Sequence, residues 1–312
     1  MSAGFLLRKL ARAGLTIWLC VTFVFIVLRL SGDPATTILP IEIVTPEIEA
    51  EFRQKWGLDA PLHSQYAAYF LNVFKGDLGY SFVDGRDAVE VVFERLPKTA
   101  ELMAISAIFT LLLGIPAGIY AALHRNSTID RLVMLASVIG FSVPSFFLAV
   151  LLILVFSVTL GVLPSSGSET WRHAVLPVFV LATAWSGIFA RFVRSAMLDV
   201  LNQDYVRAAL ARGVPWMVAV RRHALPNAAI PTATMLGLFM GGLITGAIIV
   251  ETVFAWPGIG RLLIDAVGNR DLAVVQVIIL LAASSMVLAN LLVDLTYGWL
   301  DPRVGANDGT RG

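Results

Sequence analysis

Charged residues are scarce in this chain. Asp, Glu, Lys and Arg make up 14% of its 312 residues and hydrophobic residues 57%, whereas a soluble globular domain carries about 25% charged residues. This balance excludes an ordinary water-soluble domain and predicts a membrane protein. The formal net charge of +1 by itself says nothing about nucleic acid, and we expect no nucleic-acid partner.

Cysteine, lysine and histidine are also rare, and each shortage removes a kind of chemistry. The single cysteine, Cys20, allows no internal disulfide and lies in an apolar run, where we expect it to pack. No lysine follows a glycine, so the chain has no P-loop with which to bind ATP. The histidines lack the spacing of a metal site, and we expect no cofactor in this chain. These residues are Lys9, Lys55, Lys75, Lys98, His63, His124, His173 and His223.

Acidic residues are missing from the middle of the long hydrophobic runs. Glu101, Glu251 and Asp294 all lie near the ends of such runs. Proton-coupled carriers bury Asp, Glu or His along the ion path, and an intramembrane protease needs a carboxylate pair or a Ser/His pair at that depth. Both classes are disfavoured, but sodium coupling through backbone carbonyls keeps a secondary, ion-coupled transporter open as an alternative.

Six charge-free runs are candidates for crossing a bilayer, which takes about 20 mostly apolar residues. The longest could hold two spans, but we interpret it as one span, about 132 to 160, because LPSSGS at 163–168 is typical of a loop. The sequence therefore predicts an all-α, polytopic protein with six transmembrane helices. The runs hold 16 residues between Arg12 and Arg29, 22 between Glu101 and His124, 37 between Arg131 and Glu169, 17 between His173 and Arg191, 27 between His223 and Glu251, and 22 between Asp271 and Asp294.

The basic residues predict that both termini are cytoplasmic, because short inner loops of membrane proteins are rich in Lys and Arg. The N-terminal run also resembles a signal peptide, but no clear cleavage site precedes Asp33, so we expect an uncleaved first helix. The short outer loops then hold 3 basic residues, Arg172, Arg261 and Arg270. The inner segments hold 13, namely Arg8, Lys9, Arg12, Arg125, Arg131, Arg191, Arg194, Arg207, Arg212, Arg221, Arg222, Arg303 and Arg311.

The long segment 31–98, predicted to lie outside the cell membrane, mixes charged and apolar residues. Thr45 suits a helix cap and Pro46 a first helical position, which predicts a short helix there. Residues 61–74 predict a second, amphipathic helix whose aromatic side chains suit the bilayer surface.

Prolines and glycines predict where the next two spans begin and bend. The second spanning helix is predicted to begin near RLPKTAEL, residues 95–102, with Pro97 in its first turn. The third contains Gly140 and Pro144, which predict a kink near the middle of the bilayer.

Residues 204–228, DYVRAALARGVPWMVAVRRHALPNA, combine arginines with small residues between two hydrophobic runs. If residues 200–220 are read as a helix, apolar side chains form one stripe along it. Gly213 and Pro215 then break this helix. Pro215 suits the first turn of a second short helix that ends at 223–226. The product is a cytoplasmic helix-turn-helix with room for another chain to approach. The stripe consists of Leu201, Tyr205, Val206, Ala209 and Leu210.

This segment resembles the EAA loop of ABC importer permeases, and specifically the dipeptide/oligopeptide and nickel permease family. Asp-Tyr-Val-Arg, Ala-x-Ala-basic-Gly and Arg-His-Ala-Leu-x-Asn match at 204–207, 209–213 and 222–227. The resemblance runs almost end to end through GDLGYSF, RLPKTAEL, VPSFF, LPSSG, ETVFAWPGIGRLL and the closing DPR. It departs in two places: Arg207 precedes Ala208 and Ala209 where the general motif has glutamate, and Leu210 replaces a basic residue.

The resemblance implies a six-span permease with the type I ABC importer fold in the bacterial inner membrane. The implied regions are an N-terminus with first helix at 1–30, an extracytoplasmic segment at 31–98, a five-helix core at 99–300 that includes a coupling loop at 195–226, and a tail at 301–312. Implied partners are a second homologous permease, two ATPases that bind ATP and magnesium, an extracytoplasmic binding protein and membrane lipid. The residues implied in coupling are Asp204, Tyr205, Arg207, Ala208, Ala209, Ala211, Arg212, Gly213, Arg222, His223 and Asn227.

The implied function is inward transport by alternating access, with no catalytic site in this chain. Di- or oligopeptides are the expected cargo, because uncharged walls suit varied peptides better than a bare metal ion. Glutathione, nickel chelates and short oligosaccharides stay open, as do a secondary carrier and a purely structural membrane subunit. We expect the substrate path to lie among the helices, at residues that the sequence does not identify.

Overall fold

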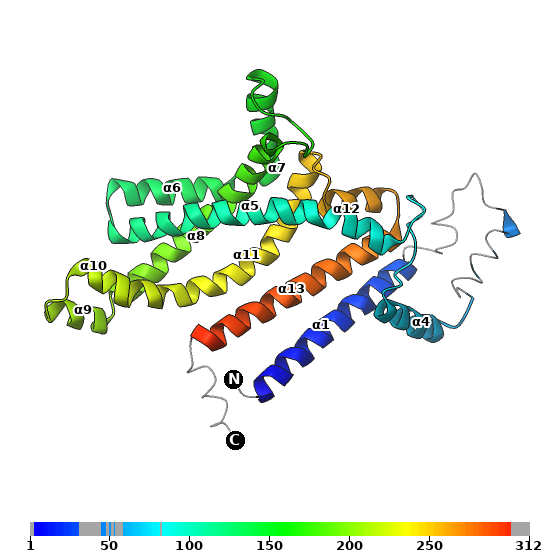
Figure 1. Ribbon diagram of the computed structural model, residues 1–312, viewed down its shortest axis with the longest axis horizontal. Coiled ribbons are helices and arrows are strands. Elements are labelled where there is room, and N and C mark those ends of the chain that lie inside the picture. Colours follow the sequence, from blue (N-terminus) through cyan, green and yellow to red (C-terminus); the bar gives the residue numbers. More distant parts are fainter. Residues whose placement is uncertain are drawn as a thin grey trace. The chain divides into compact units, whose positions relative to one another are not determined.

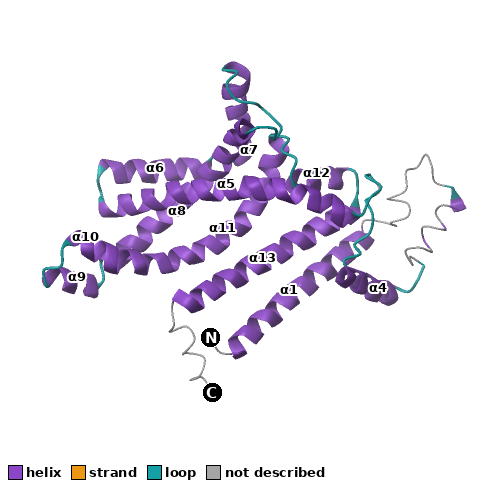
Figure 2. Cartoon of the chain, in the orientation of Figure 1, coloured by secondary structure: helices purple, strands orange, loops and turns teal. Residues whose placement is uncertain are grey.

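The computed structural model describes residues 3–30, 45–47, 50, 53, 59–81 and 83–300. In this part of the chain the regular structure is helical, and the only β pairing is an isolated antiparallel bridge between Tyr80 and Asp87 (Figure 2). The chain forms two compact units, Thr99–Pro257 with the chain from Leu288 onward, and Ala3–Lys98 with Gly258–Val287. The helical character agrees with the all-α prediction.

The unit that begins at Thr99 contains most of the helices (Figure 1). It holds the larger part of α5 (Ala88–Leu123) and the last residues of α13 (Leu272–Leu300). The helices that it holds completely are α6 (Thr128–Ser142), α7 (Ser145–Leu152), the π-helix η1 (Ile153–Thr159), α8 (Trp171–Leu201), α9 (Asp204–Ala211), α10 (Trp216–Ala219), the π-helix η2 (Val220–Ala224) and α11 (Leu225–Val253).

The other unit is built on α1 (Ala3–Leu30), α4 (Leu62–Lys75) and α12 (Ile259–Gly268), with the first turns of α5 and most of α13. Helix α4 confirms the amphipathic helix predicted at 61–74. Its Tyr66 hydroxyl lies 2.7 Å from the Thr22 hydroxyl of α1, and the Tyr66 ring lies 5.2 Å from that of Phe25. Of the short helix predicted after Thr45, Pro46 and Glu47 are helical, and most of the remainder lies outside the described residues.

Helix α5 begins earlier than the predicted start near 95–102. Asp87 accepts a hydrogen bond from the backbone N–H of Val89 at 2.7 Å, which caps the new helix at Ala88. Val91 and Val92 are buried with residues of α12 and α13. This packing stabilises the helical residues that precede the predicted start. Pro97 therefore lies inside the helix and not in its first turn.

Three described helices are long and apolar enough to cross a membrane, and up to five spans result if each of two bent helix pairs counts as one. The three are Ala88–Leu123, Trp171–Leu201 and Leu272–Ala289, and α1 adds a shorter apolar stretch, Ala11–Val27. The count of six spans and the cytoplasmic termini stay predictions.

The predicted third span is not one gently kinked helix. Thr128–Ser142 and Ser145–Thr159 meet at 97°. Between them Val143 is extended, with φ −79° and ψ 120°, because the ring of Pro144 disfavours a helical conformation in the residue before it. The kink predicted near Pro144 is present, but it is a sharp break between two helices.

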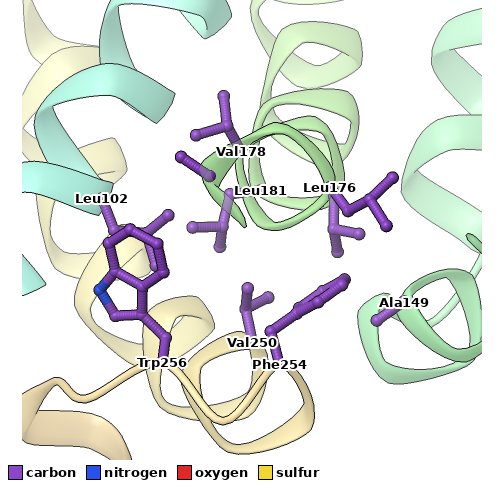
Figure 3. Close-up of a cluster of buried hydrophobic side chains, with 10 residues drawn as sticks. Leu102, Ala149, Leu176, Val178, Leu181, Val250, Phe254 and Trp256 are labelled. Carbon is purple, nitrogen blue, oxygen red and sulfur yellow. The ribbon is translucent and has the colours of Figure 1, made fainter. Parts of the chain in front are cut away.

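Three buried clusters hold the larger unit together, and one of them is formed by Phe189 and Phe239. At one end Trp256 and Phe254, which follow α11, point toward Leu181 and Leu176 of α8 (Figure 3). At the other end a second cluster joins α5, α8, η2 and α11, next to residues 204–224. Its buried members are Ala122, Val193, Ala196, Met197, Val220, Ala224 and Ala228.

Candidate functional site

Helix α9 is a separate short helix between α8 and a tight turn (Figure 1). The first helix of the predicted helix-turn-helix begins later than residue 200, because α8 ends at Leu201 and Gln203 is extended, with φ −73° and ψ 148°. Asp204 then lies in the first turn of α9, where a negative charge favours the helix dipole. Asp204 also pairs with Arg207 at 3.1 Å, with both side chains largely exposed.

The predicted apolar stripe is only partly buried in α9. Val206 and Ala209 are buried, whereas Tyr205 is 44% exposed. Helix α9 therefore attaches through one narrow apolar edge and presents its remaining surface outward. Ala208 and Ala211 are both exposed on this surface.

Gly213 ends α9 as predicted. Its backbone is left-handed, with φ 83°. The N–H of Val214 donates to the Ala209 carbonyl at 3.2 Å and that of Gly213 to the Leu210 carbonyl at 2.9 Å. This pair of bonds is a Schellman motif, which satisfies carbonyls that a helix end otherwise leaves free.

Helix α10 starts just after Pro215, whose carbonyl accepts hydrogen bonds from the N–H groups of Val218 and Ala219 at 2.9 and 3.0 Å. The second helix does not end at 223–226 as predicted, because it runs through η2 directly into α11. A π-helical turn immediately before Pro226 accommodates a residue that has no N–H to donate. We call residues 204–224 the α9–α10 hairpin.

The exposed face of the hairpin combines apolar and basic side chains. Trp216 is 45% exposed, Met217 50% and Val218 36%, in addition to Tyr205. Arg207, Arg212, Arg221 and Arg222 are all exposed as well. Tyr, Trp, Met and Arg are the residue types enriched where proteins bind one another, so this face has the composition of a binding surface.

The remaining predicted coupling residues lie within or next to the same hairpin. The Arg207 and Arg212 side chains donate to the carbonyls of Asn202 and Ala208, at 3.0 and 3.2 Å. Arg222 is exposed, His223 is half-buried, and the Asn227 amide donates to the His223 carbonyl at 2.6 Å. The structure thus brings the predicted residues together on one segment, although Ala209 supports it from inside.

The base of the hairpin was not identified from the sequence. Val193 and Met197 of α8, with Val220 and Ala224 of η2, are buried in one cluster. Their spacing of four residues was a usable signal, because such residues share a helix face. The cluster holds the C-terminal end of the hairpin against α8, and it joins this end to the adjoining ends of α8 and α11 through Leu201 and Ala228.

A groove of about 720 Å³ lies among α5, α6 and α8 in the same unit. Its lining is apolar apart from Glu101 and the hydroxyls of Ser137, Thr183 and Ser186. A groove of this composition suits an apolar occupant.

Protein-family models and individual known proteins that are similar to this chain point to the same family. The family model described as "Binding-protein-dependent transport system inner membrane component" matches residues 114–306, and the corresponding N-terminal model matches residues 2–104. The chain is 42% identical over 302 residues to the "Glutathione transport system permease protein GsiC" of Escherichia coli K12 and to that of Salmonella typhimurium, covering 96% of this chain and 98% of each relative.

Solved structures share the fold at lower identity. One is the inward-facing MetNI methionine ABC transporter, with a TM-score of 0.55, 20% identity, and coverage of 68% of this chain and 96% of that chain. Another is an amino acid ABC transporter with histidines, with a TM-score of 0.52, 19% identity, and coverage of 67% and 93%.

Proposed function

Because this chain belongs to the family of binding-protein-dependent transport system inner membrane components, we propose that the α9–α10 hairpin is its contact with the ATPase. The chain is a multi-pass permease subunit of an ABC importer in the bacterial inner membrane, with the type I importer permease fold. It has no catalytic activity of its own. This membership replaces the ion-coupled carrier and the purely structural subunit considered from the sequence.

One observation supports the hairpin more than any other: its outer face is exposed, whereas its C-terminal end is packed against α8. Trp216 and Met217 are 45% and 50% exposed, while Val220 and Ala224, a few residues on, are buried with Met197 of α8. A docking surface that transmits force needs both properties. The coupling residues proposed are those named from the sequence, with Ala209 supporting them from inside and with Trp216 and Met217 added.

In the proposed mechanism, ATP and magnesium bind to the separate ATPase subunits and close them on one another. Their closure moves the hairpin, and the attached ends of α8 and α11 move with it. The helices then change from an inward-open to an outward-open arrangement. ATP drives this change because it binds one arrangement of the assembly more tightly than the other.

An ABC permease works with ATPase subunits and a substrate-binding protein, and we propose a second, homologous permease and two ATPases. The proposed docking surface for the binding protein is the outer segment 31–98 with the 254–273 loop. Within that surface, the Ser81 hydroxyl donates to the buried carboxylate of Asp271 at 2.5 Å. This bond ties the GDLGYS loop to the start of α13, which supports an organised surface there.

The cargo proposed is a short peptide. Relatives 42% identical over nearly the whole chain are named for glutathione transport, and glutathione is itself a tripeptide, so it is the first candidate. Nickel chelates and oligosaccharides are the alternatives. The test is to purify the cognate binding protein and measure its affinity for glutathione, dipeptides, a nickel chelate and a short oligosaccharide. Binding of the nickel chelate or oligosaccharide alone would contradict a peptide cargo.

The hairpin is tested by Ala209→Arg in the assembled transporter. Ala209 is 2% exposed, so an arginine there displaces α9 from its base. We expect the permease to insert into the membrane at normal levels and ATP-dependent uptake to be lost. Normal uptake would count against the coupling role.

A further inference from the structure

Asp130 and Arg194 form a buried ion pair between α6 and α8. Arg194 Nε donates to Asp130 Oδ1 at 2.5 Å, and Nη2 donates to Oδ2 at 2.7 Å. The Asp130 side chain is 4% exposed and that of Arg194 22%. Two parallel bonds between a guanidinium and a carboxylate fix direction as well as distance. The pair therefore sets how α6 and α8 lie against each other at this point.

Asp130 also holds the turn between α5 and α6. Its Oδ2 accepts a hydrogen bond from the backbone N–H of Asn126 at 2.9 Å. Its own backbone N–H donates to the Ser127 hydroxyl at 3.2 Å, which caps α6. A single carboxylate thus joins α8 to the α5–α6 turn.

The ion pair lies close to the base of the hairpin. Val193, adjacent to Arg194, is buried in the same cluster as Ala122 of α5 and Val220 of η2. Helix α8 ends at Leu201, and seven helical residues beyond Arg194 extend about 10 Å. Val220 and Ala224 of the hairpin are buried with Met197 of α8, so a displacement of this end of the hairpin reaches the ion pair through the last turns of α8.

Helices α6 and α8 also touch closely farther along their length. A β-carbon at Gly187 of α8 would lie 2.8 Å from the Ser137 carbonyl oxygen of α6. One at Gly140 of α6 would lie 3.1 Å from the Thr183 carbonyl oxygen of α8. With the ion pair, these contacts attach α6 to α8 at three points, so the two helices move as one body.

We propose that Asp130 and Arg194 are positioning residues for transport, which pass the movement of the α9–α10 hairpin to α6 and the α5–α6 turn. The proposal rests on the proposed function, because it requires an ATPase to drive the hairpin. Neither side chain needs to contact cargo or nucleotide in this role. Losing one partner would leave the other charge buried without its counter-ion, so a clean test keeps the charge or removes both charges.

Two variants meet this condition. Arg194→Lys keeps the positive charge but cannot form two parallel bonds, and Asp130→Asn combined with Arg194→Gln removes both charges while keeping groups that can form hydrogen bonds. Arg131→Gln is the matched control, because Arg131 is the exposed neighbour of Asp130 on the same helix.

The experiment uses the complete transporter in proteoliposomes with its binding protein. Glutathione and the dipeptide alanylalanine are the two probes, in separate arms. We measure the yield of assembled complex, basal ATP hydrolysis, and uptake per ATP hydrolysed. Both ion-pair variants should assemble and hydrolyse ATP at the basal wild-type rate, with uptake per ATP about tenfold lower, and Arg131→Gln should match wild type.

Wild-type uptake per ATP in both ion-pair variants would overturn the proposal. Failure of both variants to assemble would also overturn it, because the pair would then serve folding alone. A wild-type transporter that takes up neither probe would instead contradict the proposed peptide cargo, whereas uptake that does not depend on ATP would contradict the proposed function, and the positioning role would fall with it.

Discussion

At the scale of single residues, Gly213 adopts the backbone conformation that ends α9 before α10 begins. Its φ of 83° lies in the left-handed region, and a β-carbon there would meet nothing within 4 Å. A substitution is therefore strained by backbone conformation and not by a clash, at a cost of about 1 kcal/mol. The sequence predicted this break because Gly is the usual residue at such a helix end.

Gly213→Asp should leave the permease in the membrane but remove most ATP-dependent uptake. The strained turn shifts the hairpin, and the new carboxylate changes the charge beside Arg212. Membrane content by immunoblot and uptake into proteoliposomes check this. The matched control is Gly161→Asp, because Gly161 also has a left-handed φ, 62°, and open space around it, but it lies outside the hairpin. Equal loss in both variants would contradict a specific role for Gly213.

Other residue roles could not be predicted because they depend on partners distant in sequence. The charges of Asp130 and Arg194 were visible, but their sequence separation of 64 gave no reason to pair them. Asp87 was missed as a cap because Pro97 offered a more familiar helix start. Ala209 was assigned to the coupling face, whereas its 2% exposure puts it underneath, among the supporting residues.

At the scale of elements, the first turn of α10 presents the largest apolar side chains of the hairpin. The double variant Trp216→Ala, Met217→Ala should weaken ATPase binding by about 2 kcal/mol, roughly 30-fold, if this face is the centre of the contact. Both side chains are about half exposed, at 45% and 50%, so the permease itself should fold normally. Co-purification of the ATPase with the permease measures the effect.

The control for that variant is Trp171→Ala. Trp171 is 76% exposed at the start of α8, whereas the hairpin follows the end of that helix. It should retain full ATPase binding. If the control lost the ATPase equally, or if the double variant retained it, the face formed by α10 would not be the contact.

The close contact of α6 with α8 leads to a separate prediction about stability. Gly187→Val should push the two helices apart, because even a β-carbon would lie 2.8 Å from the Ser137 oxygen. Overpacking of this kind costs about 1–3 kcal/mol. Gly14→Val is the control, since a β-carbon at Gly14 of α1 meets nothing within 4 Å. The thermal unfolding midpoint of the purified permease should fall in the first variant and not in the second.

Helix types and breaks were more predictable than helix directions. Gly213 and Pro144 marked two breaks, whereas the break at Gln203 was missed. The 97° between the helices on either side of Pro144 depends on how each packs, which no local pattern shows. The continuity of α10 with α11 was missed because Pro226 usually stops a helix, and the π-helical turn Val220–Ala224 that lets the chain pass it has no clear sequence signal.

At the scale of the whole molecule, the sequence predicted a helical membrane permease because its charge-free runs and its EAA-like segment are both local patterns. The division into two compact units was not predicted, since it depends on contacts between distant segments such as Ser81 with Asp271. The central claim concerns the assembled transporter: the α9–α10 hairpin is the part of this chain that the ATPase moves.

The most direct measurement is an electron cryomicroscopy structure of the complete transporter with and without ATP. The account predicts that Tyr205, Trp216 and Met217 are buried against an ATPase subunit, and that α6 and α8 shift together with them when ATP binds. A structure in which these side chains contact only solvent, or lie across the bilayer from the ATPases, would contradict it.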